Sequence, residues 1–191
     1  MQYGFYFDQS RCNGCFTCLI ACKDWHEYDL GFEPANWIKV SAIEKGRFPD
    51  LSMNYLFISC LHCAHPNCLP ACPVGAITKR GEDGITVVDR EACLGSEGCE
   101  GFCKEACPYK APEFGSEPGA KIQKCNLCLD RWAEGKKPIC VTACPMRALD
   151  AGPFDKLKME YGDIRIAEGF IYSEKVSPSI VFKLKRQGGG L

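Results

Sequence analysis

Sixteen cysteines are the residues of this 191-residue chain whose type and spacing could do chemistry. Such a density is typical of disulfide scaffolds or of metal proteins. The cysteines form four groups of four, and three residues separate the last two cysteines of every group. The groups are Cys12, Cys15, Cys18 and Cys22; Cys60, Cys63, Cys68 and Cys72; Cys93, Cys99, Cys103 and Cys107; and Cys125, Cys128, Cys140 and Cys144.

The repeated unit is the run C-x2-C-x2-C-x3-C followed by proline, which binds iron–sulfur clusters in bacterial ferredoxins. The first group has these gaps, and the other three groups keep the final gap and place Pro73, Pro108 and Pro145 after their fourth cysteine. In such a run, three thiolates from one tight loop bind one cluster, and the fourth cysteine binds the other cluster of a pair. Four runs therefore predict four [4Fe-4S] clusters.

The order of the groups predicts how the fourth ligands are exchanged. Groups two and three are neighbours in the sequence and form one pair, so groups one and four pair around them. The predicted ligand sets are Cys12, Cys15, Cys18 with Cys144; Cys125, Cys128, Cys140 with Cys22; Cys60, Cys63, Cys68 with Cys107; and Cys93, Cys99, Cys103 with Cys72.

Disulfides and zinc are the alternative uses of so many cysteines. The N-terminus has no basic leader, twin arginine or long apolar core, so we expect no secretory signal, and disulfides are disfavoured in a reducing compartment. Structural zinc prefers two C-x2-C pairs per ion, which the fourth group roughly offers and the first group does not. Iron–sulfur clusters are the favoured interpretation.

Charge and motif content exclude several classes of function. Lys and Arg number 23 against 24 Asp and Glu, so nothing suggests nucleic acid as a partner. No Ser-His-Asp set or glycine-rich phosphate loop is visible, so we expect no small-molecule substrate and no chemistry beyond one-electron steps. The longest apolar run, residues 55–61, is far shorter than the ~20 residues of a membrane span.

The pattern predicts an α+β fold made of two pseudo-symmetric bacterial two-cluster ferredoxin-like units with short strands, helices and long loops. We expect a single compact chain over 1–191, with an inner unit at 55–112, an outer unit at 1–54 plus 113–154, and a C-terminal extension at 155–191 that packs on the core or on a partner. The predicted strands are 3–8, 37–43, 54–59, 76–79, 85–89 and 179–184; the predicted helix is 16–28, with helical turns at 100–106, 127–134 and 139–143 and a loose tail at 188–190.

Several segments together resemble the iron–sulfur subunit of dimethyl sulfoxide reductase-type molybdoenzymes. They are Arg11–Cys18, Ala21–Asp24, His62–Cys63, Ala71–Pro73, Gly135–Cys140 and Cys144–Asp150. The resemblance covers nearly the whole chain, and it implies a non-catalytic, four-cluster wire between a molybdopterin catalytic subunit (molybdenum or tungsten bis-MGD) and a membrane quinone-reactive subunit. It further implies that groups one and four face the catalytic subunit, that the inner pair faces the membrane partner, and that the chain is peripheral on the prokaryotic cytoplasmic membrane.

One spacing departs from the family pattern. Five residues separate Cys93 from Cys99, where the family usually has two, and relatives can carry Trp at the position of Cys99 and hold a three-iron cluster. The cysteine present here predicts four irons.

Two questions stay open at this point. The alternative function is a free-standing soluble polyferredoxin that shuttles electrons, although such shuttles are usually strongly acidic and this chain is balanced. His62 and His65 flank Cys63, where each either donates to a cluster or takes up a proton, or else serves ordinary packing.

Overall fold

The computed structural model describes residues 1–26 and 35–185, which contain seven strands and six helices. In chain order they are β1 (Tyr3–Asp8), α1 (Thr17–His26), β2 (Lys39–Arg47), β3 (Asp50–Ile58), β4 (Ile77–Lys79), β5 (Thr86–Val88), α2 (Ser96–Cys99), α3 (Phe102–Ala106), α4 (Leu129–Ala133), α5 (Ile139–Ala143), β6 (Leu149–Pro153), α6 (Phe154–Tyr161) and β7 (Ile180–Lys183).

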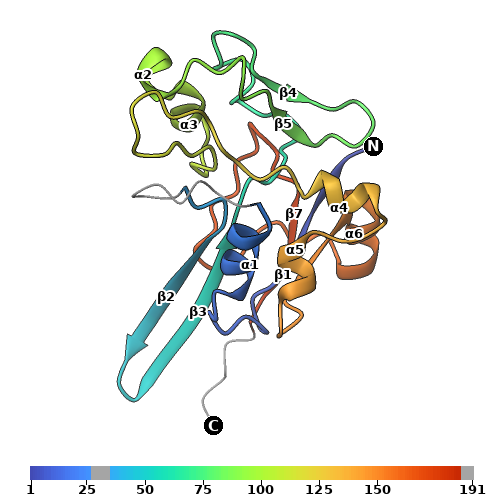
Figure 1. Cartoon of the computed structure of the whole chain (residues 1–191). Helices are drawn as coiled ribbons and strands as arrows, with labels where there is room; N and C mark the ends of the chain where they lie inside the picture. Colours follow the sequence, from blue (N-terminus) through green and yellow to red (C-terminus); the bar gives the residue numbers. More distant parts are fainter. Residues whose placement is uncertain (27–34, 186–191) are drawn as a thin grey trace.

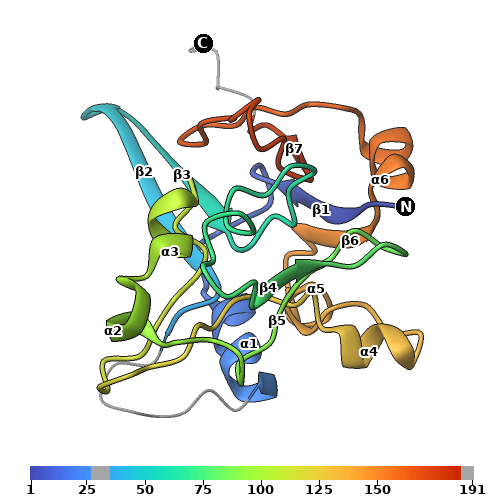
Figure 2. The same ribbon diagram turned by 90° about the horizontal axis from the view of Figure 1, so that it is seen from above.

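The central sheet brings the two ends of the described chain together in the order β6-β1-β7. Phe5 of β1 lies opposite Ala151 in the antiparallel pairing with β6 and opposite Ile180 in the parallel pairing with β7. Figure 2 shows the three strands side by side. Nearly every residue of β1 is buried, because both of its faces are covered. On one face, Tyr6 and Val181 pack on α6. The predicted strands at 3–8 and 179–184 are confirmed, the second with slightly shorter bounds.

The β2–β3 hairpin projects from the body of the molecule (Figure 1). Its pairing runs without interruption from Lys39 opposite Ile58 to Arg47 opposite Asp50, with the turn at Phe48 and Pro49. Both strands predicted here, 37–43 and 54–59, are present, but their predicted ends at the turn were wrong. Gly46 has φ 92°, and a Cβ there would collide with the Asp50 carbonyl oxygen, so glycine allows the ladder to continue to the tip.

Three elements were missed by the sequence analysis. Strand β6 has little β-propensity and owes its extended form to pairing with β1. Helix α6 starts after Pro153 and ends at Gly162, and α2 lies inside the long gap of the third cysteine group. The predicted helix at 16–28 is seen as α1 up to His26; residues 27–28 and the predicted tail at 188–190 lie outside the described residues.

Buried residues form one large and two smaller hydrophobic clusters. The large cluster surrounds Phe5, Phe57 and Phe182 and includes cysteines of groups one, two and four, whereas a second cluster around Ile77 and Ile122 includes Cys68, Cys93 and Cys103. The mixed α and β content confirms the predicted class at that level, while the pseudo-symmetry and the division into units stay predictions. Within residues 1–26 and 35–185, no helix has the length and apolar character needed to cross a membrane.

Candidate metal centres

The first cysteine pocket joins two distant parts of the chain. Its cysteines are Cys12, Cys15, Cys18 and Cys144, from the β1–α1 loop, the start of α1 and the end of α5. Helices α1 and α5 pack against each other, which brings these segments together. Phe16, which is 45% exposed, and the exposed Met146 line the mouth, and Cys15 is itself exposed. This pocket therefore reaches the molecular surface.

The second pocket, called the interior site below, has a mostly buried wall in which only Pro108 is exposed. Its cysteines are Cys60, Cys63, Cys68 and Cys107. The apolar side chains of Leu61 and Val176 in its wall are almost fully buried. Thr86 and Lys124 also line it, and both are buried. This pocket thus combines deep burial with a polar section of wall.

The third pocket lies beside α2 and α3. Its cysteines are Cys72, Cys93, Cys99 and Cys103. The exposed Val74 and Leu94 contribute to the wall, and the buried Ile77 and Ile122 close the opposite side. Cys99, at the end of the long gap, lies in the same pocket as its predicted partners. The longer loop therefore keeps this cysteine within reach of the set.

The remaining four cysteines are Cys22, Cys125, Cys128 and Cys140, and three of them, Cys22, Cys125 and Cys140, belong to the large hydrophobic cluster. All four are buried. Burial raises the pKa of the Cys140 thiol well above its usual value, and the nearby thiols of Cys125, Cys128 and Cys22 raise it further. His26 Nε2 lies 3.3 Å from Cys128 Sγ. The structure thus brings together the members of every predicted set.

A repeated turn follows the fourth cysteine in groups two, three and four. The amide of Ala76 donates to Cys72 Sγ and that of Ala148 to Cys144 Sγ, each over 3.3 Å. Burial raises the pKa of the Cys107 thiol, and a main-chain hydrogen bond from Ala111 opposes that rise. The residue before each alanine (Gly75, Lys110 and Arg147) has a positive φ. The proline after each of these cysteines was expected from the sequence, whereas the longer pattern C-P-x-x-A, which occurs three times, was not. The turn aims one main-chain donor at each of these sulfurs.

The thiols differ in how readily they ionise. Burial raises the pKa of Cys18, Cys68 and Cys128 to about 12 and that of Cys103 to about 11. Hydrogen bonds from Thr17 lower the pKa of the exposed Cys15 instead. Buried neutral thiols without ion partners are costly to deprotonate, so metal binding there must displace protons.

The shape and chemistry of the pockets fit iron–sulfur clusters. The first, second and third pockets are each lined by four thiols and mostly by apolar side chains otherwise. A tetrahedral zinc ion needs its sulfurs about 2.3 Å from one point. Among residues 1–26 and 35–185, no three His, Cys, Asp or Glu side chains are arranged to hold a single ion. Thiols spaced around such cavities suit a multinuclear cluster.

The two histidines beside Cys63 have different surroundings. His62 is fully buried, and its Nδ1 accepts a hydrogen bond from the Thr86 amide. Burial lowers the pKa of His62 well below its usual value, and the charges of Lys124 and Lys79 lower it further. His65 is exposed. The structural role of His62 is therefore to fix β5 beside the second pocket.

Comparison with known families agrees with this chemistry. Residues 11–76 and residues 51–153 each match a 4Fe-4S dicluster domain. The fold and the cysteine sets thus define an iron–sulfur protein built from two dicluster, ferredoxin-like domains.

Curated relatives narrow the class further. The sequence is 42% identical over 190 residues to a chain of the anaerobic dimethyl sulfoxide reductase of Escherichia coli strain K12, covering 95% of the present sequence and 88% of that protein. It is 34% identical over 160 residues to the thiosulfate reductase electron transfer subunit PhsB of Salmonella typhi, covering 83% and 80%. It is also 34% identical over 165 residues to a subunit of the sulfite dehydrogenase of Allochromatium vinosum, covering 77% and 67%.

This protein belongs to the family of iron–sulfur subunits of dimethyl sulfoxide reductase-type enzymes, which confirms the resemblance found in its cysteine motifs. It is therefore an iron–sulfur electron-transfer subunit. The number of clusters and the identity of each ligand stay predictions.

Proposed function

We propose that the protein holds four [4Fe-4S] clusters and relays electrons between a molybdopterin catalytic subunit, with molybdenum or tungsten bis-MGD, and a membrane quinone-reactive subunit. The observation that carries this proposal is the meeting of four cysteines, one predicted set at a time, in three separate pockets. The fourth set, Cys22, Cys125, Cys128 and Cys140, would hold the fourth cluster. A [4Fe-4S] cluster supplies a carrier for one electron, and the chain's own residues hold it and control its surroundings.

The position of the pockets supports a path with two surface ends. The first pocket has exposed apolar rim residues, Phe16 and Met146, and the third pocket has Val74 and Leu94. In Figure 1, α2 and α3, beside the third pocket, lie at the top of the molecule, and the loop after α5, at the first pocket, lies at the lower edge of the body. The second pocket has a wall that is mostly buried, with only Pro108 exposed. Electrons would therefore enter at one end and leave at the other.

The relatives' names support a fixed place in a complex. Each name denotes one component of a larger enzyme, and the enzymes are two reductases and a dehydrogenase. By analogy, we infer that this protein binds a catalytic subunit and a membrane partner, and that it is peripheral on the prokaryotic cytoplasmic membrane as part of that complex. A free polyferredoxin shuttle is the competing function.

Anaerobic purification of the protein from its native host tests the proposal. We expect an absorbance band near 400 nm, about sixteen irons per chain and elution with a catalytic and a membrane subunit. Full iron in a free monomer of 21.2 kDa would contradict the complex and favour the shuttle. A chain loaded mainly with zinc would contradict the clusters themselves.

A further inference from the structure

Lys124 is a buried cation in the wall of the second pocket. Its side chain is 4% exposed, and Nζ donates to the carbonyl oxygens of Thr86 (2.6 Å) and Cys125 (2.8 Å). In the part of the chain that the structure describes, no carboxylate forms an ion pair with it. Burying an ammonium group without a negative partner is unfavourable, because hydrogen bonds to two carbonyl oxygens do not offset the free-energy cost of removing the charge from water. The fold therefore needs a negative charge close to Lys124.

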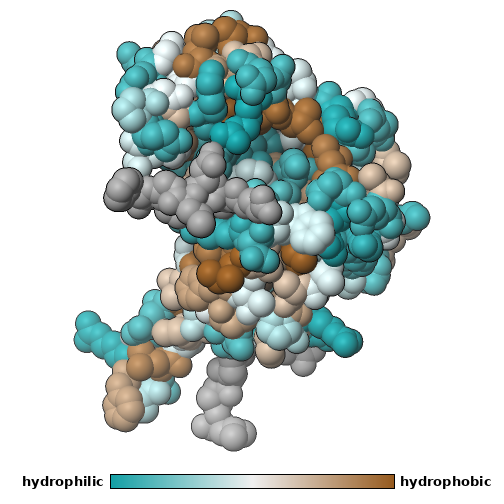
Figure 3. Space-filling model, viewed as in Figure 1, coloured by the Kyte–Doolittle hydropathy of each residue, from teal (hydrophilic) through white to brown (hydrophobic). Residues whose placement is uncertain are grey.

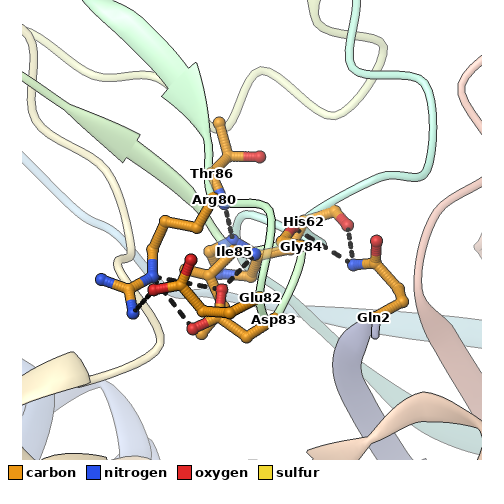
Figure 4. Close-up of polar contacts among 8 residues, drawn as sticks. All are labelled: Gln2, His62, Arg80, Glu82, Asp83, Gly84, Ile85 and Thr86. Carbon is orange, nitrogen blue, oxygen red and sulfur yellow. Dashed lines mark hydrogen bonds and ion pairs between the residues drawn. The ribbon is translucent and has the colours of Figure 1, made fainter.

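Thr86 ties Lys124 into the frame of the pocket. The Thr86 amide donates to His62 Nδ1 over 3.1 Å, and its carbonyl accepts from Lys124 (Figure 4 shows the bond to His62). Gln2 Nε2 donates in turn to the His62 carbonyl over 2.7 Å. The Thr86 hydroxyl is buried and has no partner among the described residues. Lys124 and Thr86 are thus held in fixed positions in the pocket wall. Among the described residues, the ammonium group has no negative partner and the Thr86 hydroxyl has no hydrogen-bond partner.

The other two mapped pockets lack this feature. The wall of the first pocket has one polar side chain besides cysteine, Asn13, and the wall of the third pocket has apolar side chains only. Neither wall contains a charged residue among those described. A positive wall is therefore specific to the interior site among these three.

We propose that Lys124 is the countercharge of the cluster held by Cys60, Cys63, Cys68 and Cys107, and that it raises the reduction potential of this interior site. This inference rests on the proposed clusters. A site that gains one electron gains one negative charge, and a fixed cation in a dry wall favours the reduced form. Because Lys124 also bonds to the Cys125 carbonyl, it links the second and fourth ligand sets. The chain's own charge then decides how readily the middle of the path holds an electron.

Redox titration of the intact complex, followed by EPR, tests this role. The signal of the interior site is the one altered by Cys68→Ser. Lys124→Gln keeps a hydrogen-bond donor and removes the charge. We therefore expect the reduction equilibrium of the interior site to shift at least tenfold toward the oxidised form, which is 59 mV for a one-electron couple. Lys124→Arg retains the charge and should stay within about threefold of the wild type. The iron content of each variant is measured alongside.

Lys121→Gln is the matched control. Lys121 also donates to a cysteine carbonyl, that of Cys93, but lines none of the three mapped pockets. The proposal would be overturned if Lys124→Gln, with full iron content, shifted the reduction equilibrium of the interior site by less than twofold. It would also be overturned if Lys121→Gln shifted the reduction equilibrium of this site as much as Lys124→Gln does. If Lys124→Gln loses iron from the interior site, Lys124→Arg must retain it, and loss in both variants would also overturn it. A wild-type complex without clusters would instead refute the proposed function.

Discussion

The first and third pockets, which both have exposed residues at their rims, share one kind of turn, but the elements around that turn differ. At both, a C-P-x-x-A turn places an amide against the sulfur of the fourth cysteine of a group, Cys144 at the first pocket and Cys72 at the third. The first pocket is completed by the ten-residue α1 and by Val40 and Phe57 of the β2–β3 hairpin. The third is completed by loops and by α2 and α3, of four and five residues. The repeat builds the cluster site, and the unrepeated segments build its surroundings.

The residues around the first and third pockets would determine which partner binds at each of them. The hairpin beside the first pocket ends in Phe48, which is 88% exposed, and apolar atoms are visible at its tip and over α1 in Figure 3. The third pocket has instead the long Cys93–Cys99 loop, which exposes Leu94. Two ends with the same metal site and different rims suit two different partners. Each of the following tests affects one end and uses the other for comparison.

Cysteine removal should have the largest effect. Cys15→Ser and Cys99→Ser each remove a predicted ligand from one end only. Because the proposed path is serial, we expect either variant to abolish electron transfer between the two proposed partners while the complex still assembles. EPR should show one altered signal in each variant, and a different one in the two. Normal signals with unimpaired turnover in either variant would contradict the path.

A charge on the rim should impair docking at one end. Phe16→Asp and Leu94→Asp place a carboxylate on an exposed apolar side chain at the first and third pockets. We expect each variant to weaken the binding of one partner by about 2 kcal/mol, or about thirtyfold in affinity, and to leave the binding of the other partner unchanged. Binding of the separate subunits measures this. Ile171→Asp, on an exposed residue that lines none of the three pockets, is the control, and equal losses in all three variants would argue against distinct docking rims.

A pair of glycines compares the packing of the two ends. Gly14 and Gly75 both have a positive φ, but a Cβ on Gly14 would collide with the Tyr55 ring, whereas a Cβ on Gly75 meets nothing within 4 Å. We expect Gly75→Ala to cost about 1 kcal/mol from backbone strain alone. Gly14→Ala should cost about 2 to 4 kcal/mol in total, since overpacking adds to the strain.

Thermal loss of the 400 nm absorbance, at one fixed scan rate, measures both glycine variants. About 2 to 4 °C per kcal/mol is expected for a chain of this size. Equal midpoints for Gly14→Ala and Gly75→Ala would show that the hairpin base yields to the new methyl group.

The site was more predictable from sequence than the fold around it. Cluster-binding runs are local, so the gaps around Cys12 or Cys60 already identify the chemistry. They also predict which distant cysteine lies beside each run, and the pockets bring those cysteines together. Strand β1 was visible because aromatic residues alternate along it. Strand β6 was not, because Asp150 and Gly152 are extended only through pairing with β1. Lys124 was missed for a similar reason, since its burial depends on β5, a segment 38 residues away.

The smallest effect concerns a single hydrogen bond at the first pocket. Thr17 Oγ1 donates to Cys15 Sγ over 3.3 Å, whereas Cys72 and Cys93 at the third pocket accept from main-chain amides. A donor to sulfur favours the more negative, reduced site, so its loss should lower the reduction potential. We expect Thr17→Val to shift the reduction equilibrium of the site at the first pocket about threefold toward the oxidised form. This is less than the 59 mV that a tenfold change represents. Thr17→Ser, which keeps the hydroxyl, should not shift it. An equal shift at the third pocket would mean that Thr17 acts through the fold and not through this bond.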